Sequence, residues 1–415
     1  MARTANGSVP HSRARAAAWL AAAALLAGCA SPSRDGGLAP VQQVVKQRID
    51  KDLVWSRSGD EQQRIDQRVS ELLQRPLSVD DAVQVALLHN PGLQAQLHDL
   101  GIGEAELVQA SRLPNPGFGF ARLTRGSEVE IERSFHVSLA RLIALPALQR
   151  VEAQRFAQTQ ANVAGAVLMV AADARKAWIQ AVAAQESVRY AQQVMAAAEA
   201  SAELARRMAQ VGNFNKLQQA REQAFYADAA LGLARAQHVQ RATRERLTRT
   251  MGLWGESVDY RLPERLPDLP TTPNELPDVE RTAIAQRLDV EGARLATQQT
   301  AHSLGLTRTT RFVNVFELGY QHNTSNEEPT QRGWEVTLEL PLFDWGQARV
   351  ARAESVYMQS LQRAAATAIN ARSEAREAYG AYRSAWDIAR HHRDEIVPLR
   401  RRICLLYTSD AADEL

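Results

Sequence analysis

The sequence predicts a mainly α-helical chain that carries a pair of membrane-type β-hairpins, built from a duplicated helix–strand–strand–long-helix repeat. About 70 of the 415 residues are alanine and aromatic residues make up only 6%, a composition that favours long, closely packed helices. Two segments of about 50 residues recur with a nearly constant offset of about 198 positions, which indicates a duplication. In each copy, two short runs alternate apolar and polar residues, as β-strands do.

The alternating runs define two faces for each predicted hairpin. Each run has about 9 to 12 residues, the length of a tilted membrane-spanning strand. Two ordinary surface hairpins on a soluble domain are the alternative interpretation. Arg133 and Asn314 are exceptions on the apolar faces. These faces comprise Val129, Ile131, Phe135, Val137 and Leu139 in the first copy, and Phe312, Phe316, Leu318, Tyr320, Trp334, Val336, Leu338 and Leu340 in the second.

A long helix is expected from Pro146, which suits a helix start, to Val211. Its ~65 residues would extend ~98 Å, too long to fold inside one compact domain, so the helix must pack along other helices. One heptad register stays apolar throughout and consists mostly of small residues, which permits close approach. That seam comprises Val167, Val170, Ala174, Ala177, Ala181, Ala184, Val188, Ala191, Met195, Ala198, Ala202, Ala205 and Ala209.

Residues Gly212 to Asn215 predict a hairpin tip after this helix. The chain then returns with apolar residues at heptad spacing, which completes an antiparallel helical hairpin. The second copy begins its own long helix near Gly346 and continues past Ile396. The returning apolar positions are Leu217, Ala220, Ala224, Ala227, Leu231 and Ala234.

The N-terminus is expected to be an export signal. A basic start precedes an apolar run over residues 16–26, which is too short to span a bilayer but suits a secretory signal. The run ends in Leu26-Ala27-Gly28-Cys29, which resembles the lipobox of bacterial lipoproteins. This resemblance implies that Cys29 is lipidated and becomes the new N-terminus, and the residues that follow it imply delivery to the outer membrane. A plain signal peptide with a chance cysteine is the alternative.

Four membrane-type strands cannot close a barrel, since bacterial barrels need at least about eight strands and an open sheet edge is not tolerated in lipid. The chain must therefore pool its strands with other copies. The helical hairpins of the copies could then form a second tube below the barrel. This combination predicts a conduit through the outer membrane and across part of the periplasm.

Three stretches carry a resemblance to the TolC-type outer-membrane efflux factor family. The most specific runs from Leu340 to Arg349, with the pattern Pro-Leu-Phe-Asp-x-Gly at a strand-to-helix junction. The others are His89-Asn90-Pro91 with Leu113-Pro114, and Gly212 followed by Leu217-Gln218-Gln219-Ala220-Arg221. The resemblance covers about residues 77 to 403.

The resemblance implies a homotrimer with a shared twelve-stranded β-barrel above a helical α-barrel. It also implies docking to a periplasmic adaptor and to an inner-membrane pump, and lipidation at Cys29 is similar to the members paired with resistance-nodulation-division pumps. The function expected from it is the outer-membrane channel of a tripartite efflux or export system. A periplasmic adaptor or structural coiled-coil lipoprotein is the alternative, although adaptors usually have a single hairpin.

The expected organisation has six parts. Residues 29–76 carry proline, glycine and charge without strong periodicity and predict a flexible tether from the lipid. Cys404 to Glu414 resembles the translation of a sequencing adapter, so we expect the natural chain to depart from this sequence at about Ile403. The parts are a signal peptide (1–28), the lipidated tether (29–76), the first repeat (77–252), a proline-rich linker (253–275), an incomplete second repeat (276–403) and a non-native tail (404–415).

No enzymatic or cofactor chemistry is predicted, because the sequence contains no recognisable nucleophile motif or phosphate-binding loop. The net charge of +2 argues against a nucleic-acid partner. His391 and His392 are adjacent and would point ~100° apart on a helix, so no metal pair is expected. Arg206 and Arg207 near the first tip could contact an adaptor or simply complement the helix end. Trp334 and Trp345 could belong to an interfacial aromatic belt or to a core.

Overall fold

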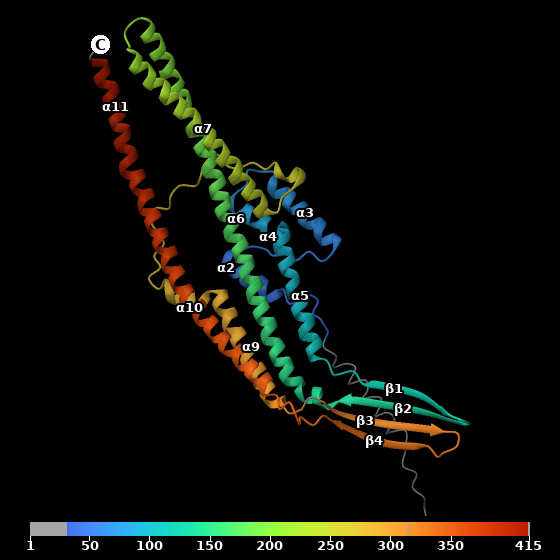
Figure 1. Cartoon of the computed structure of the whole chain (residues 1–415). Helices are drawn as coiled ribbons and strands as arrows, with labels where there is room; N and C mark the ends of the chain where they lie inside the picture. The colour runs from blue at the N-terminus through green and yellow to red at the C-terminus, as the bar shows by residue number, and fades with distance from the viewer. Residues whose placement is uncertain (1–30, 314, 414–415) are drawn as a thin grey trace, which may run out of the picture. The chain divides into compact units, whose positions relative to one another are not determined.

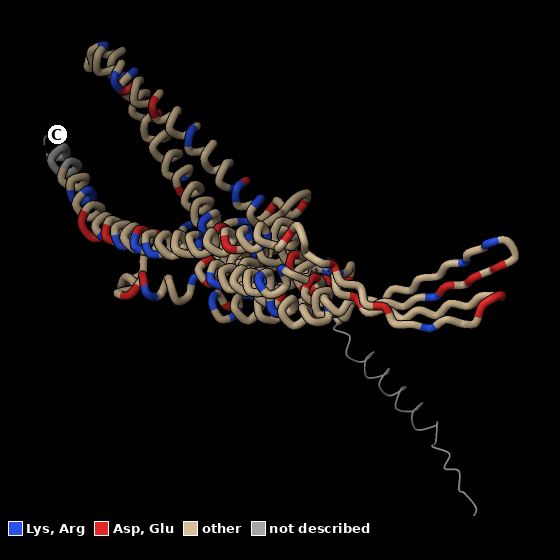
Figure 2. Tube along the Cα trace, turned by 60° about the horizontal axis from the view of Figure 1, so that its bottom comes forward, with Lys and Arg blue, Asp and Glu red and all other residues tan. Residues whose placement is uncertain are grey.

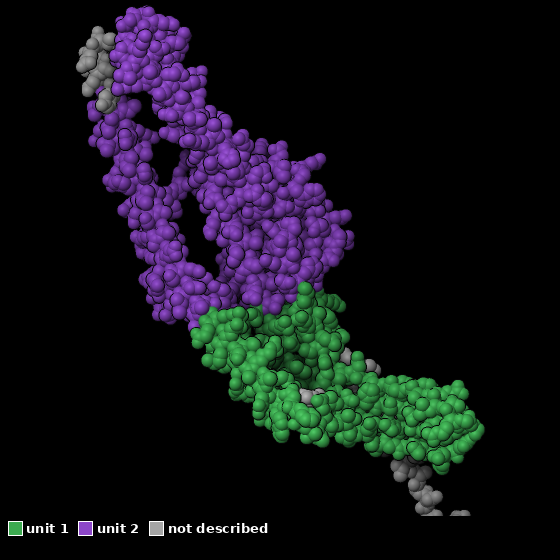
Figure 3. Space-filling view, in the orientation of Figure 1, with its two compact units in different colours: residues 1–37, 101–158, 294–363 green, residues 38–100, 159–293, 364–415 purple. Residues whose placement is uncertain are grey.

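The computed structural model describes residues 31–313 and 315–413 of the chain. It divides into two compact units, each assembled from segments of both halves of the sequence (Figure 3). Unit 1 contains residues 31–37, 101–158 and 294–363, whereas unit 2 contains residues 38–100, 159–293 and 364–413. The long helices contribute residues to both units, so the units do not coincide with the predicted repeats.

The same order of elements occurs twice along the chain, as the duplication predicts: two helices, two strands, then a long helix. In both copies a short break separates the first two helices, at Asn90 and at Arg287. The first copy is α4 (Val79–His89), α5 (Pro91–Ser111), β1 (Gly117–Arg125), β2 (Glu128–Ser138), α6 (Leu139–Gln210) and α7 (Lys216–Met251). The second is α8 (Val279–Gln286), α9 (Leu288–Thr310), β3 (Phe316–Ser325), β4 (Gln331–Leu338), α10 (Gln347–His391) and α11 (Val397–Asp413).

Unit 1 contains one antiparallel sheet in the order β1-β2-β3-β4, whose strands lie side by side in Figure 1. The two hairpins join through β2 and β3, which come from different halves of the sequence. Gly126 has a φ of 64° in the two-residue connection between β1 and β2, a conformation that tight hairpin turns require. A mainly helical chain with a small antiparallel sheet is therefore confirmed.

The main hydrophobic core lies in unit 2, and it includes the segment predicted to be a tether. Two helices precede α4: α2 (Ala39–Ile49) and α3 (Gly59–Leu73). Val41 and Val45 of α2 are buried, as are Ile65 and Val69 of α3. The tether prediction is therefore wrong for residues 38–76, because amphipathic helices bury apolar residues there instead of leaving the chain extended.

A local signal marked the start of α3. The Ser58 side chain accepts a hydrogen bond from the backbone N–H of Glu61, and the Glu61 carboxylate accepts one from the backbone N–H of Arg57. A serine followed three residues later by glutamate is a helix-start pattern. These backbone and side-chain hydrogen bonds hold the pKa of Glu61 below its usual value. The α3 helix thus begins with satisfied N–H groups.

Helix α6 begins at Leu139, so the predicted start at Pro146 is wrong and the proline lies inside the helix. The Ser138 hydroxyl, at the last position of β2, accepts a hydrogen bond of 3.4 Å from the backbone N–H of Arg141. Ser138 therefore provides the N-terminal cap directly after the strand. Pro146 is accommodated despite lacking the N–H that would bond the Leu142 carbonyl.

The predicted seam of α6 is confirmed within unit 2, because each of its alanine, valine and methionine positions is buried or half-buried. The corresponding prediction for α7 is wrong. Leu217 and Leu231 are 61% and 55% exposed, and Ala224, Ala227 and Ala234 are exposed as well. The α7 row that is buried or half-buried instead comprises Glu222, Tyr226, Ala229, Leu233, Ala236 and Gln240.

The proline-rich linker is non-helical apart from a 3₁₀ turn at Gly255–Val258. It is nevertheless fixed to the long helices of unit 2. The Tyr260 hydroxyl lies 3.0 Å from the Thr248 hydroxyl of α7, and burial raises the pKa of Tyr260. Trp386 of α10 donates its indole N–H to the Pro270 carbonyl over 3.2 Å. The linker therefore packs as part of unit 2.

The second long helix begins at Gln347, as predicted, and passes through a π-helical turn at His392–Ile396 before α11. Pro398 lacks the N–H that would bond the Asp394 carbonyl, and prolines and π turns are known causes of irregularity in helices. Helix α11 continues to Asp413, so the helical pattern persists where the sequence analysis expected it to end. The origin of residues 404–415 stays a prediction.

The His89-Asn90-Pro91 motif joins α4 and α5 to the end of α7. Asn90 donates its side-chain amide to the Thr250 carbonyl over 2.8 Å, and the ring Nδ1 of His89 lies 3.1 Å from the Gly252 carbonyl oxygen. Gly252 ends α7 with a φ of 73°. A Cβ atom built on Gly252 would lie 2.7 Å from Pro91 Cδ and 2.9 Å from the His89 carbonyl oxygen. Only glycine fits this close approach without strain.

We therefore expect Gly252→Ala to destabilise the protein by about 2–4 kcal/mol, since it combines left-handed backbone strain with a clash against backbone atoms. Thermal unfolding followed by circular dichroism measures the change. Gly232→Ala is the matched control, because Gly232 lies inside α7 with no atom within 4 Å of an added Cβ. This control should be neutral or stabilise by up to about 1 kcal/mol. Equal midpoints for the two variants would contradict the proposed fit at Gly252.

Candidate functional site: an amphipathic sheet and a helical hairpin

One face of the sheet, here called the apolar face, carries a row of aromatic residues across all four strands. Phe118 pairs with Phe135, Phe135 with Tyr320, and Tyr320 with Trp334. Residues directly opposite in antiparallel strands project from the same face. The ring centroids of Phe118 and Phe135 lie 4.9 Å apart, and those of Tyr320 and Trp334 lie 5.1 Å apart. Trp334 is 74% exposed, so it does not belong to a core of this chain.

The rows next to the aromatic row, toward the helices, are also apolar. Val137 pairs with Leu318, Leu318 with Val336, and Phe316 with Leu338. None of these five side chains is buried. An exposed apolar surface of this kind marks contact with a membrane or another protein. The strand faces are therefore confirmed as predicted, with the exceptions that Leu139 begins α6 and Phe312 and Leu340 lie outside the strands.

The opposite face, here called the polar face, is rich in glutamate and glycine. Acidic and basic residues both occur along the strands in Figure 2, and the register places the glutamates of the strands on this face. A Cβ added to Gly117 would lie 2.0 Å from the His136 ring, and one added to Gly119 would lie 2.4 Å from Ser134 Oγ. These glycines therefore make room for polar side chains of β2. The glutamates of the polar face are Glu128, Glu130, Glu132, Glu317 and Glu335.

The sheet has two open edges. In the described ranges, β1 pairs only with β2 and β4 pairs only with β3. An unpaired strand edge presents free N–H and C=O groups that can pair with another chain. The strands have 9, 11, 10 and 8 residues, close to the roughly 9–11 that cross a membrane when tilted. Sheet length, facial polarity and open edges thus agree with a membrane barrel shared between chains.

The Leu340–Arg349 motif forms the connection from β4 to α10. Asp344 accepts a hydrogen bond of 2.8 Å from the Gly346 N–H, and Arg349 donates to the Arg311 carbonyl over 2.9 Å. Gly346 has a φ of 70°, and a Cβ there would lie 2.9 Å from the Arg311 carbonyl oxygen. The motif therefore shapes a tight turn against the end of α9. Phe343 is fully exposed and Trp345 is half-exposed, so a second exposed aromatic group lies beside the sheet.

The helical hairpin of unit 2 ends in a charged, well-ordered tip. Gly212 has a φ of 83°, and Asn215 and Gln218 form a reciprocal capping box at the start of α7. Glu203 accepts hydrogen bonds of 2.8 Å from Arg206 and 2.7 Å from Arg207. These arginines, first Arg206 and then Arg207, lower the pKa of Glu203 from its ordinary 4.5 to about 2. The sequence analysis missed Glu203, although its spacing of three and four residues from the arginines predicts the contacts.

The exposed apolar row of α7 lies on the side of the helix opposite its buried row. At 100° per residue, Leu231 projects about 180° from the centre of the buried row. The exposed row is therefore not part of the contact with α6. It comprises the positions first expected to form the hairpin seam, Leu217, Ala220, Ala224, Ala227, Leu231 and Ala234, and it offers a second surface for helix packing.

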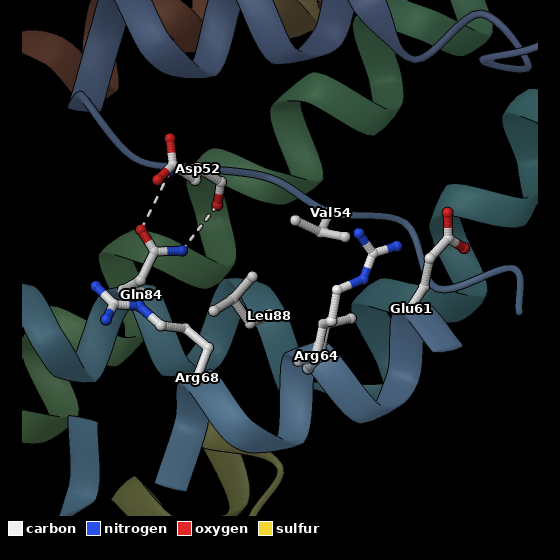
Figure 4. Close-up of a pocket in the computed structure, with 8 residues that line it drawn as sticks. Asp52, Val54, Glu61, Arg64, Arg68, Gln84 and Leu88 are labelled. Atoms are coloured by element: carbon white, nitrogen blue, oxygen red, sulfur yellow. Dashed lines mark hydrogen bonds between the residues drawn. The ribbon is translucent and has the colours of Figure 1, made fainter. Parts of the chain in front are cut away.

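Unit 2 contains a cavity of about 310 Å³ between α3, α4 and the segment that precedes α3 (Figure 4). The Gln84 side chain and the Asp52 backbone exchange two hydrogen bonds of 2.8 and 3.2 Å beside it. The lining side chains include no hydroxyl, thiol, imidazole or amine that could act as a nucleophile. They are Asp52, Val54, Glu61, Arg64, Ile65, Arg68, Gln84 and Leu88.

In the part of the chain that is described, no three histidine, cysteine, aspartate or glutamate side chains come together in a way that could hold a metal ion. The ring Nδ1 of His391 lies 3.2 Å from the Glu395 carboxylate, which is an ion-pair geometry within one helix. The predicted lipidation site, Cys29, lies outside the described residues. Of the helices described, none combines the length and the hydrophobicity that a membrane-crossing helix needs.

Comparison with solved structures relates the whole arrangement to outer-membrane channels. No protein-family model and no curated protein matches the sequence. The outer-membrane channel OprN superposes with a TM-score of 0.61 and 15% identity, over 84% of this chain and 80% of OprN. The CmeC outer membrane channel of Campylobacter jejuni gives a TM-score of 0.54 and 15% identity, over 85% and 82% of the two chains.

The outer membrane protein VceC of Vibrio cholerae gives a TM-score of 0.57 and 14% identity, over 70% of this chain and 75% of VceC. At these identities the likeness is one of fold. The chain therefore has the fold of outer-membrane channels, as its resemblance to the TolC-type family implied for the single chain. The likeness extends to both halves of the chain, since it covers at least 70% of its length.

The ion pairs of Glu203 should make the stability of the hairpin tip depend on pH. Because the pKa of Glu203 is lowered in the folded state, its contribution to tip stability is complete above about pH 4.5 and is lost as the pH falls through about 2. We expect amide hydrogen exchange around residues 203–210 to be faster in Glu203→Gln than in the wild type at pH 6. The difference between the two proteins should be smaller at pH 3 and absent below pH 2. Glu199→Gln, on the same helix, is the control and should leave exchange at the tip unchanged. A difference that vanishes by pH 4 would contradict the low pKa.

Proposed function

We propose that this chain is the outer-membrane channel component of a tripartite efflux or export system, a passive conduit from the periplasm to the exterior. The observation that carries the proposal is the amphipathic four-stranded sheet with two open edges, in a chain that has the fold of outer-membrane channels. Enzymatic activity is not part of this function, since a conduit needs only a lined passage.

The sheet becomes stable in lipid only if its open edges are paired. In a membrane, an unsatisfied backbone group costs several kcal/mol, so strands must form closed barrels. Joining the β4 edge of one copy to the β1 edge of the next satisfies both edges at once. Three copies supply twelve strands, the number that the TolC-type resemblance implies. The apolar face then meets lipid and the polar face lines the passage, as in other membrane barrels.

The exposed row of α7 in the helical hairpin gives independent support for a homotrimer. Each α7 helix carries a mixed row, which is buried or half-buried, and an apolar row on the opposite side, which is exposed. Helices with two apolar seams can pack into closed tubes, because each helix then has a neighbour on either side. We propose that the exposed row of α7 packs against a long helix of a neighbouring copy to form an α-barrel in the periplasm.

The proposed partners follow from these placements and from the family resemblance. The hairpin tip with Arg206, Arg207 and Glu203 is the proposed contact with a periplasmic adaptor, which would link the channel to an inner-membrane pump of the resistance-nodulation-division type. Lipidation of Cys29 would add an anchor to the outer membrane. The inserted barrel and not this anchor would then hold the protein in the membrane.

A matched pair of substitutions in β4 tests the channel function. Val336 lies on the apolar face opposite Leu318, whereas Thr337 lies on the polar face opposite Glu317. Both residues are exposed in the single chain. On a Cys29→Ser background, Val336→Lys should prevent outer-membrane insertion, because a lysine on a lipid-facing strand costs about 2–4 kcal/mol per copy. Thr337→Lys should insert normally, as measured by membrane fractionation and by heat-resistant oligomers on gels.

The Cys29→Ser parent is itself informative in this experiment. Its retention in the outer membrane is expected from a barrel. Its recovery in the soluble periplasm would contradict the channel function and favour a lipid-tethered adaptor. Equal behaviour of the two lysine variants would contradict the assignment of the sheet faces to lipid and passage.

A substitution in the exposed apolar row of α7 tests the proposed contact between copies. Leu231→Glu should weaken the trimer, because it places a charge in the proposed helix contact between copies. Light scattering after size-exclusion chromatography in detergent should show dissociation at low protein concentration, with the helical content of the chain unchanged. Gln223→Glu adds the same charge at another exposed α7 position and serves as the control. A trimer that resists Leu231→Glu as well as Gln223→Glu would argue against this packing.

A further inference from the structure

Unit 2 carries an open groove of about 790 Å³ that the channel function does not use. Helix α3 and the 3₁₀ turn after α7 line this groove, together with His89 at the end of α4. The groove combines one large aromatic ring with many polar side chains. Its lining residues are Gln62, Asp66, Val69, Ser70, Leu73, Gln74, His89, Trp254, Gly255, Glu256, Ser257 and Asp259.

The aromatic ring belongs to Trp254, which is 78% exposed. The turn that carries it is held at both ends, because Leu253 before it and Tyr260 after it are buried. Arg244 of α7 also donates hydrogen bonds to the backbone carbonyls of Val258 and Tyr260, over 3.2 and 2.6 Å. The indole therefore projects from a fixed turn, which lowers the cost of ordering it when a ligand binds.

Several polar side chains of the groove are free to bind a ligand. In the described part of the chain, five of them form no hydrogen bond to another protein group. Their carboxylate and amide oxygens accept hydrogen bonds, and their hydroxyl and amide groups donate them. A ligand with many hydroxyl groups can therefore replace the water bound there. These five side chains are those of Ser70, Gln74, Glu256, Ser257 and Asp259.

The charges beside the groove are close to balance. Arg261 donates to the Gln74 carbonyl over 3.1 Å, and Arg244 donates to the Val258 carbonyl. The His89 ring Nε2 lies 3.9 Å from the Asp66 carboxylate. Two guanidinium groups and an imidazole thus lie near three carboxylates, which favours a neutral ligand over a strongly charged one. The carboxylates are those of Asp66, Glu256 and Asp259.

We propose that the groove binds the glycan strand of the bacterial cell wall, with one sugar ring stacked on Trp254. A pyranose ring has a face of C–H groups and an edge of hydroxyl groups. The negatively polarised face of an indole attracts the C–H groups, while the polar side chains of the groove bond the edge. The choice of the cell wall as the source rests on the proposed function, which places the helical part of the chain in the periplasm.

Binding of chitotetraose, a neutral oligomer of N-acetylglucosamine, to the full-length protein in detergent tests the groove. Isothermal titration calorimetry should show that Trp254→Ala weakens binding about tenfold, because the stacked ring is lost. Trp254→Phe keeps an aromatic face and should retain most of the affinity. Val258→Ala is the matched control and should bind as the wild type does. Val258 lies in the same turn and is 40% exposed, but it does not line the groove.

Co-sedimentation with purified cell-wall sacculi tests the source of the glycan. The wild type should sediment with the sacculi, chitotetraose should compete, and Trp254→Ala should stay in the supernatant. Wild-type affinity for chitotetraose in Trp254→Ala would overturn the sugar site. A wild type that does not sediment with sacculi would overturn the cell wall as its occupant. Sedimentation that tetra-arginine abolishes and chitotetraose does not would overturn the inference in favour of a basic peptide.

Membrane fractionation of the wild type keeps this inference separate from the proposed function. A wild-type protein absent from the outer membrane would contradict the channel function. An inserted protein that binds neither chitotetraose nor sacculi would contradict only the glycan site.

Discussion

The pairing of β2 with β3 is the contact on which the arrangement of unit 1 depends. It joins the two hairpins, which are separated by about 200 residues of sequence, into one sheet. The hydroxyl of Ser127 and the backbone N–H of Val129 donate hydrogen bonds to Glu327 and Asn326 in the loop after β3. Ser325, the last residue of β3, donates one to Glu128. The same pairing leaves one open edge on each outer strand in the described chain. A single copy therefore has a defined sheet register without a closed surface.

The helical hairpin in unit 2 likewise buries one surface and leaves another exposed. Small residues such as Ala198 and Ala205 are fully buried in the seam of α6, which permits close contact with α7. The other side of α7 is also apolar but exposed. The sheet edges and the outer row of α7 are thus two independent surfaces that one copy leaves uncovered. Both are the surfaces that the proposed homotrimer would cover.

The sequence was sufficient to predict features with a local cause. The strand faces follow from alternation, and the seam of α6 follows from a continuous heptad pattern. The seam of α7 was assigned incorrectly because two of its rows contain apolar residues, and only the contact with α6 decides which becomes buried. Helices α2 and α3 were missed because they are short, although Ser58 and Glu61 signal the start of α3. The start of α6 was misplaced because Ser138 caps the helix from within a strand. The aromatic row required the strand register, which sequence periodicity does not provide.

The distribution of charge in β2 argues that the two sheet faces meet different surroundings. The strand alternates Glu130, Ile131, Glu132 and Arg133, which places the carboxylates on one face and the guanidinium group on the other. On the surface of a soluble sheet, opposite charges on one face would stabilise each other across strands. Here the acidic residues of β2, β3 and β4 share one face, whereas Arg133 and Arg332 lie on the other, and only Arg125, at the end of β1, stands opposite a glutamate. Such a separation gains nothing within the chain, so its physical reason lies in what each face contacts. In the proposed function the glutamates would face the water of the passage, and the apolar face would meet lipid.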